Sequence, residues 1–219
     1  SFLRCHICDN PKIKFYVLHS KSMITESNIF GVSSYIRSSG KLKFCNFNLV
    51  QIASCSECGF SSNDRDHFKQ TKNSESKFSV EEFKKGWEER IGTMLKKAKD
   101  HGENFYGENR DQQHGILSYD LAIKTFEQIA SISKDEVKKF AALRKQASML
   151  MTQAELLMEN KQRDAAEKNL QTVVEILEPI FESLKGADSI HVCLLLFQIK
   201  IYFSDLQSAA QYMKFMDNF

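Results

Sequence analysis

Two CxxC motifs, Cys5-His6-Ile7-Cys8 and Cys55-Ser56-Glu57-Cys58-Gly59, lie in the first part of a chain of 219 residues. A CxxC turn lets both sulfur atoms face one point, and two such turns supply the four thiolates of a tetrahedral zinc shell. A closed shell leaves no position for water or substrate, so it stabilises a fold instead of catalysing a reaction. The motifs therefore predict one structural zinc ion. Its predicted ligands are Cys5, Cys8, Cys55 and Cys58.

Gly59 supports this prediction, because glycine readily takes the positive φ that turns backbone N–H groups toward thiolates. Other ligand sets stay open: His67, His19 or Cys45 could replace a predicted thiolate, or the cysteines could be unrelated buried or redox residues. Cys45 and Cys193 lie in apolar patterns, and we interpret both as core residues.

Catalysis would need an open position in the zinc shell, where a bound water could be activated. The chain contains no HExxH motif, no deaminase signature, no phosphate-binding glycine loop and no nucleophile elbow. We therefore predict that the protein is not an enzyme.

The composition is that of a globular protein, with 42% hydrophobic residues and a net charge of only +2. Such a charge creates no strong overall attraction to nucleic acid. No apolar run approaches the roughly 20 residues that cross a bilayer. We expect no secretory signal, because Cys5 comes before any apolar h-region could form. The expected location is the cytoplasm.

Residues 1–75 show the pattern of a zinc-ribbon-like β module. Polar and apolar residues alternate at 12–20 and 41–53, which predicts strands, and serines with a glycine at 33–40 predict turns between them. The polar stretch 61–79 is interpreted as a connection to the rest of the chain.

From Ser79 onward, apolar residues recur every three or four positions, which predicts helices. Ser79 with Glu82 and Ser133 with Glu136 form capping-box patterns that mark two helix starts. Trp87 falls on an apolar stripe and is predicted to be a core residue. The expected helices cover about 79–100, 116–129, 133–160, 163–178, 189–203 and 206–216, with a loop at 101–115 and Pro179 as a stop.

An internal repeat links these helices. Ala122, Ala166 and Ala209 are 44 and 43 residues apart, and each is followed by large apolar residues four and seven positions later. Stacked helical hairpins bury a shared core in this way. The predicted fold class is therefore α+β, with the β module at 1–75 and an all-α, tetratricopeptide-like hairpin stack at 76–219. An irregular bundle with coincidental spacing is the alternative.

These features together resemble a bacterial family called domain of unknown function 2225. Its members begin with a CxxC motif, return with a second CxxCG and continue into tetratricopeptide-like helices. The matching stretches are Cys5–Cys8, Cys55–Ser61 and Asn109-Arg110-Asp111 through Ser118-Tyr119-Asp120-Leu121-Ala122. The resemblance implies a zinc-binding helical-repeat protein of unassigned activity. The chain departs from the family in its few prolines near the second motif and in its longer repeat.

Two functional hypotheses follow. The first is a protein-interaction scaffold that presents the helical surface to a protein or peptide. The second is a nucleic-acid-binding protein whose β module places basic residues on phosphates and aromatic residues on bases. The residues concerned are Lys12, Lys14, Phe15, Tyr16, Tyr35, Arg37, Lys41 and Lys43. A homo-oligomer is also possible through an apolar C-terminal face of Met213, Phe215, Met216 and Phe219.

Overall fold

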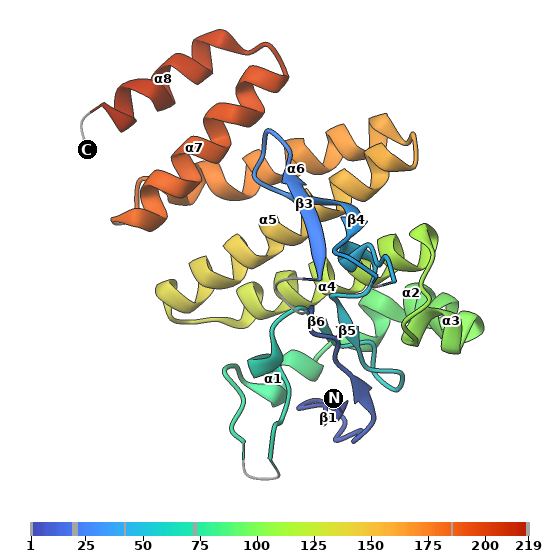
Figure 1. Cartoon of the computed structure of the whole chain (residues 1–219). Coiled ribbons are helices and arrows are strands. Elements are labelled where there is room, and N and C mark those ends of the chain that lie inside the picture. Colours follow the sequence, from blue (N-terminus) through green and yellow to red (C-terminus); the bar gives the residue numbers. More distant parts are fainter. Residues whose placement is uncertain (1, 19–21, 42, 72–73, 185, 218–219) are drawn as a thin grey trace.

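The computed structural model describes residues 2–18, 22–41, 43–71, 74–184 and 186–217. It combines short strands in the N-terminal part with helices that follow from residue 80 onward (Figure 1). The predicted α+β class is confirmed. His19 and Phe219, which the sequence predictions include, lie outside the described residues.

The described strands form three antiparallel pairs: β1 (Phe2–Leu3) with β2 (Ile13–Lys14), β3 (Met23–Ser27) with β4 (Ser33–Ser38), and β5 (Ala53–Ser54) with β6 (Ser61–Ser62). Most of the predicted strand pattern is wrong. The serines expected in turns form β4, because the tight turn at Asn28–Val32 returns the chain along β3.

Residues 41–53 contain the 3-10 helix η1 (Phe47–Leu49) instead of a long strand. The Asn46 side chain accepts a hydrogen bond from the Asn48 backbone N–H at 3.1 Å and so caps this turn. Asparagine favours such local bonds over a strand ladder, which the alternation of apolar residues did not reveal. A second 3-10 helix, η2 (Arg65–His67), lies in the segment predicted as a connection.

The helices occupy nearly the predicted positions. Their bounds are α1 (Val80–Lys84), α2 (Trp87–His101), α3 (Glu103–Tyr106), α4 (Gln112–Ile132), α5 (Glu136–Glu159), α6 (Arg163–Phe181), α7 (Ala187–Tyr202) and α8 (Leu206–Met216).

Four details of the helix predictions are wrong. Gly86, at φ +68°, divides the first predicted helix into α1 and α2. Asp135, and not Ser133, caps α5 by accepting from the Lys138 N–H at 3.1 Å. Pro179 lies inside α6, because a proline in the last turns removes only one bond of the ladder. The predicted loop 101–115 also contains α3 and the start of α4.

Two hydrophobic cores hold the molecule together. The first joins the β module to α1, α2 and α4, and it includes Cys55, Phe60, Trp87 and Phe126. The second lies between α5, α6, α7 and α8. Because the first core draws on residues both before and after 75, the predicted division there stays a prediction.

The β3–β4 hairpin extends from the module across α5 toward α7 (Figure 1). The Asn28 Nδ2 group donates to the Glu155 carboxylate at 2.7 Å, and Ser34 Oγ donates to its other oxygen. At the tip, Phe30 packs edge-on against Tyr202 with ring centroids 5.6 Å apart. The hairpin is thus tied to the C-terminal helices.

Helix α7 has a mostly apolar sequence, which suggests burial on all sides, but one of its sides is exposed. Val192, Cys193 and Leu196 face the second core, whereas Leu194 on the other side is 41% exposed. Met213 on α8 is 51% exposed, and Phe215 and Met216 pack against the core. Within the described residues, no helix combines the length and apolarity that crossing a membrane requires.

Candidate metal centre

The two CxxC motifs fold into loops with the same backbone hydrogen bonds. The Cys5 N–H donates to Asn10 O at 2.9 Å, and the Asp9 N–H donates to Cys5 O at 3.1 Å. In the second loop, the Cys55 N–H donates to Phe60 O and the Gly59 N–H to Cys55 O, both at 2.9 Å. Asp9 and Gly59 both take positive φ, at 64° and 70°. The loops are therefore equivalent, and the positive φ predicted for Gly59 is confirmed.

These loops bring the four sulfur atoms together. Cys5 Sγ lies 3.6 Å from Cys58 Sγ, Cys8 Sγ lies 3.4 Å from Cys55 Sγ, and all four lie within 4.8 Å of one another. A disulfide would need about 2.05 Å. Four sulfurs at about 2.3 Å from a tetrahedral metal are about 3.8 Å apart. The geometry is compatible with a metal site.

The protonation of the cluster also favours a cation. Hydrogen bonding to Cys55 raises the pKa of Cys5, hydrogen bonding to Cys5 raises the pKa of Cys58, and burial adds to both shifts. Hydrogen bonds with Cys5 lower the pKa values of Cys8 and Cys55. Without a cation, the cluster therefore keeps protons on part of its sulfurs. A divalent ion would replace those protons and let all four ligate.

The alternative ligands lie elsewhere. Among the described residues, the only group with the geometry of a metal site consists of the four predicted cysteines. Cys193 is fully buried in the second core, and Cys45 is half-buried near Lys43 and Glu108. His67 Nδ1 is 2.8 Å from Ser62 Oγ, and its ring packs edge-on against Phe126.

His67 predicts a pH effect on stability. Burial lowers its pKa from 6.5 to about 4. Because the pKa of His67 is lower in the folded than in the unfolded state, the free energy of unfolding is at its full value above pH 6.5. It decreases as the pH falls from 6.5 toward 4, by up to about 3 kcal/mol. Urea unfolding at pH 7 and pH 4.5 checks this. His67→Gln should lose less stability on acidification than wild type, whereas exposed His191→Gln should match wild type; equal slopes for all three contradict the prediction.

The surroundings connect the cluster to the helices. Ile7 N–H points to Cys5 Sγ at 3.3 Å, and Asn10 Nδ2 to Cys55 Sγ at 3.7 Å. Trp87, the only tryptophan and 1% exposed, donates from Nε1 to the Cys58 carbonyl at 2.7 Å. Its predicted core position is confirmed. The start of α2 is therefore bonded to the second CxxC loop.

Gly59 gives a prediction on packing. A Cβ at this position would lie 2.5 Å from Ile91 Cδ1, and Ile91 is fully buried in α2. We expect Gly59→Ala to destabilise the protein by about 3 kcal/mol, from the positive φ together with the overlap. Gly31, at φ +74° with no atom within 4 Å of its Cβ position, is the matched control. Gly31→Ala should cost about 1 kcal/mol. Equal losses in urea unfolding would show that the contact with α2 is unimportant.

Residues 3–216 match the family described as "Uncharacterized protein conserved in bacteria (DUF2225)". The chain belongs to the DUF2225 family. The predicted resemblance is confirmed. No curated protein and no solved structure matches the chain.

Sequence reasoning missed one residue that joins the two parts of this DUF2225 protein. Arg110 is 5% exposed, and its guanidinium donates to the carbonyls of Phe105, Ile52 (2.7 Å) and Leu49 (3.5 Å). It also lies over the Phe105 ring, 5.1 Å from the centroid. A single arginine in a polar stretch carries no sequence signal of such a role.

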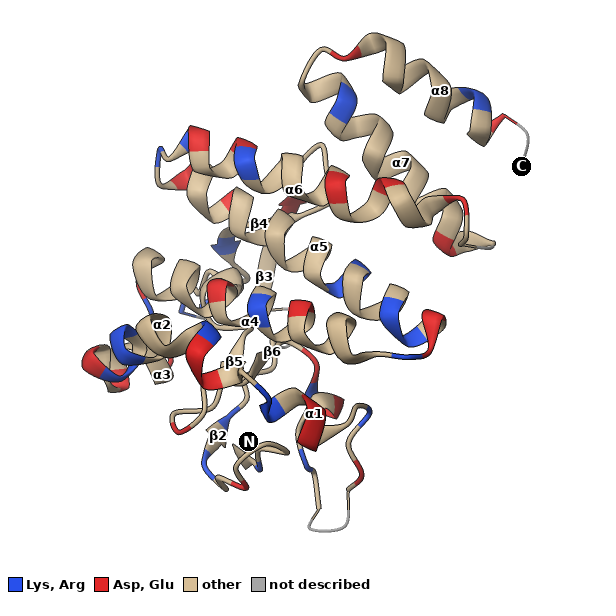
Figure 2. Ribbon diagram, turned by 180° about the vertical axis from the view of Figure 1, so that it is seen from behind, with Lys and Arg blue, Asp and Glu red and all other residues tan. Residues whose placement is uncertain are grey.

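The basic residues proposed for nucleic-acid binding are partly engaged. Lys14 pairs with Glu103 at 2.6 Å, and Tyr35 packs edge-on against Phe47. On the face shown in Figure 2, basic and acidic residues both occur along α2, α5 and α6.

Proposed function

We propose that this DUF2225 protein is a zinc-stabilised, non-catalytic protein-interaction scaffold that works in the cytoplasm. The observation that carries the proposal is the hydrogen bond from Trp87 Nε1 to the Cys58 carbonyl. Through this bond the second CxxC loop supports the start of α2, so a metal bound by the cluster would have a structural role. Four thiolates would also complete the shell of one Zn²⁺ ion, which is the common ligand set of structural zinc.

The helices support the scaffold role. Consecutive helices α4 to α8 pack against their neighbours, and the repeat positions Ala122, Ala166 and Ala209 are all buried. Small residues at these sites allow close approach of the facing helices, as in a tetratricopeptide-like stack. The burial of these small residues supports the repeat that the sequence predicts.

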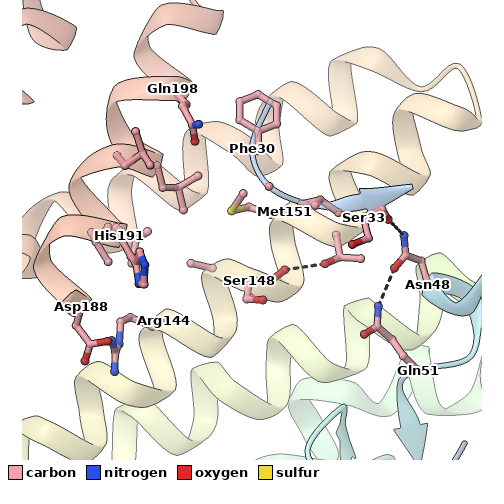
Figure 3. Close-up of a pocket in the computed structure, with 18 of the residues that line it drawn as sticks. Phe30, Ser33, Asn48, Gln51, Arg144, Ser148, Met151, Asp188, His191 and Gln198 are labelled. Carbon is pink, nitrogen blue, oxygen red and sulfur yellow. Dashed lines mark hydrogen bonds and ion pairs between the residues drawn. The ribbon is translucent and has the colours of Figure 1, made fainter. Parts of the chain in front are cut away.

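A cavity of about 520 Å³ offers a surface for a partner. Phe30 and Ser33 of the hairpin, Ser148 and Met151 of α5, and Gln198 of α7 point toward it (Figure 3). Asn48 and Gln51 close one end through hydrogen bonds of 2.7 Å to Ser33 O and 3.0 Å to Asn48 Oδ1. Apolar walls with amide and hydroxyl groups suit a peptide, whose backbone needs such partners.

The metal is tested by elemental analysis and X-ray absorption at the zinc edge, on protein purified without added metal. One zinc per chain with four sulfur neighbours supports the proposal. Mixed sulfur and nitrogen or oxygen ligation would favour hydrolytic chemistry instead, and absence of metal would overturn the structural role.

Trp87 provides a further prediction about metal removal. Because its indole bonds to the second CxxC loop, chelation should shift its emission to longer wavelength, and zinc should restore it. Fluorescence during titration with a chelator measures this. The same chelator should leave the emission of a Cys5→Ser variant unchanged. Loss of metal without any spectral change would contradict the coupling of cluster and helix.

The partner surface is tested with a photo-reactive amino acid at Gln198, inside the cavity, and at Lys96, on the exposed face of α2 as control. A discrete cross-linked protein adduct that forms in cells of the source organism from position 198, and not from position 96, supports the scaffold role. Equal adducts from both positions, or none, count against it. Binding to single-stranded nucleic acid that weakens steeply with salt would favour the alternative hypothesis.

A further inference from the structure

A second cavity, of about 700 Å³, lies between residues 64–67 and 76–78 on one side and α4 and α5 on the other. Arg144 and Ser148 line both cavities, so the two cavities are neighbours along α5. Its volume is in the range of small-molecule sites. We call it the His67 cavity.

Its charges favour an anion. Lys138, Ala141, Lys145 and Ser148 follow one another at helical spacing and line the cavity from α5. Within the described residues, the Lys138 ammonium has no ion pair, and Lys145 meets Asp64 only at 3.9 Å.

The other charged groups at the cavity are already paired. Lys77 bonds Asp66 at 3.2 Å, and Arg144 pairs with Asp188, although the Arg144 Nε is buried with no hydrogen-bond partner among the described residues. The cavity and its ion pairs together contain four cations and three carboxylates, so an added anion meets a net positive charge. The cations are Lys77, Lys138, Arg144 and Lys145, and the carboxylates are Asp64, Asp66 and Asp188.

His67 adds a neutral donor. Ser62 Oγ accepts from the Asp64 N–H at 2.9 Å and lies 2.8 Å from His67 Nδ1. Because the Ser62 side chain is fully buried, we assign its proton to this second contact, with Nδ1 as the acceptor. His67 then carries its ring proton on Nε2, away from Ser62. Since the ring lines the cavity, this N–H is available to a ligand.

Most of the remaining wall is apolar. Its apolar residues are Phe78, Phe126, Ile129, Ala141 and Ala142, and the hydroxyl-bearing Ser76 and Ser133 also line the cavity. An inorganic anion would leave the apolar residues without contact, and a purely apolar ligand would leave Lys138 and His67 without an acceptor.

We propose that the His67 cavity binds a carboxylate carried on an apolar body, with the acid at Lys138, Lys145 and His67 and the body against Phe78 and Ala141. Two sources supply this chemistry: a free amphipathic acid, or an acidic side chain beside an aromatic one in a protein segment. The inference does not depend on the scaffold role, because a free acid would bind without any protein partner.

The test is a chemical-shift titration of the whole chain with 3-phenylpropionate. We expect shifts at the amides of Ala141 and Lys145 and a Kd on the order of 1 mM, as befits a fragment. Acetate, which lacks the ring, and 3-phenylpropan-1-ol, which lacks the charge, should each bind at least about tenfold more weakly.

Variants locate the site. The double variant Lys138→Ala with Lys145→Ala should weaken 3-phenylpropionate about tenfold, whereas Lys139→Ala, one position away and outside the cavity, should not. Equal binding of acid and alcohol, an unaffected double variant, or shifts elsewhere on the protein would overturn the proposal. If these tests support the site, two further ligands distinguish the sources. Tighter binding of decanoate than of N-acetyl-Phe-Glu-Phe-amide identifies a free acid as the ligand, and the reverse identifies an acidic side chain in a protein segment.

Discussion

Cys5→Ser is expected to abolish metal binding and to lower the free energy of unfolding by at least about 5 kcal/mol. Cys5 is fully buried, and its sulfur lies 3.6 Å from that of Cys58. A serine hydroxyl stays protonated and cannot replace the thiolate, and structural zinc contributes about 10–16 kcal/mol to the folding of small zinc domains. In a chain of 219 residues, the midpoint of thermal unfolding should fall by about 10–20 °C. Calorimetry with parallel metal analysis measures both effects.

Cys193→Ser is the matched control. Cys193 is equally buried, but its sulfur bonds the Tyr212 carbonyl at 3.3 Å in the second core. A hydroxyl can donate to the same carbonyl, so we expect a loss of about 1 kcal/mol and unchanged metal content. Similar losses in the two variants would mean that the cluster contributes no more than an ordinary buried thiol.

Arg110→Met should destabilise the protein by about 3–5 kcal/mol. The substitution keeps much of the side-chain volume but leaves the carbonyls of Phe105, Ile52 and Leu49 without their donor. Buried acceptors without partners cost about 1–3 kcal/mol each, and some relaxation will recover part of this. Urea unfolding monitored by circular dichroism gives the value.

Arg163→Met separates this effect from the loss of any arginine. Arg163 pairs with Glu167 on the surface of α6, with its own side chain 76% exposed. Exposed pairs contribute about 0–1 kcal/mol. If Arg110→Met costs no more than this, the three carbonyls find other partners and the arginine does not join the module to the helices.

The cysteine cluster and the helices were predictable because their signals are local. A CxxC loop needs only four residues, and a helix repeats its pattern every few residues, so both can be found without knowing the partner segment. The four predicted cysteines do lie together, and α8 begins and ends at the predicted residues.

The strands were not predictable in the same way. β4 is rich in serine, and it is held by pairing with β3 and by the bond from Ser34 to Glu155, 121 positions later in the chain. Arg110 likewise depends on carbonyls of Leu49 and Ile52 that only the folded chain brings near. Interactions between distant segments leave little trace in either segment alone.

The shared first core has a consequence for synthesis on the ribosome. Both CxxC loops are complete at Cys58, but Phe126, which belongs to the same hydrophobic core as Cys5 and Cys55, follows 68 positions later. At 5–20 residues per second, this interval lasts about 3–14 s. During that time the thiols are open to metal ions and oxidants alike. Early capture of a metal would therefore protect the thiols and would hold the ends of the segment 9–54 together until the helices that bury it have been made.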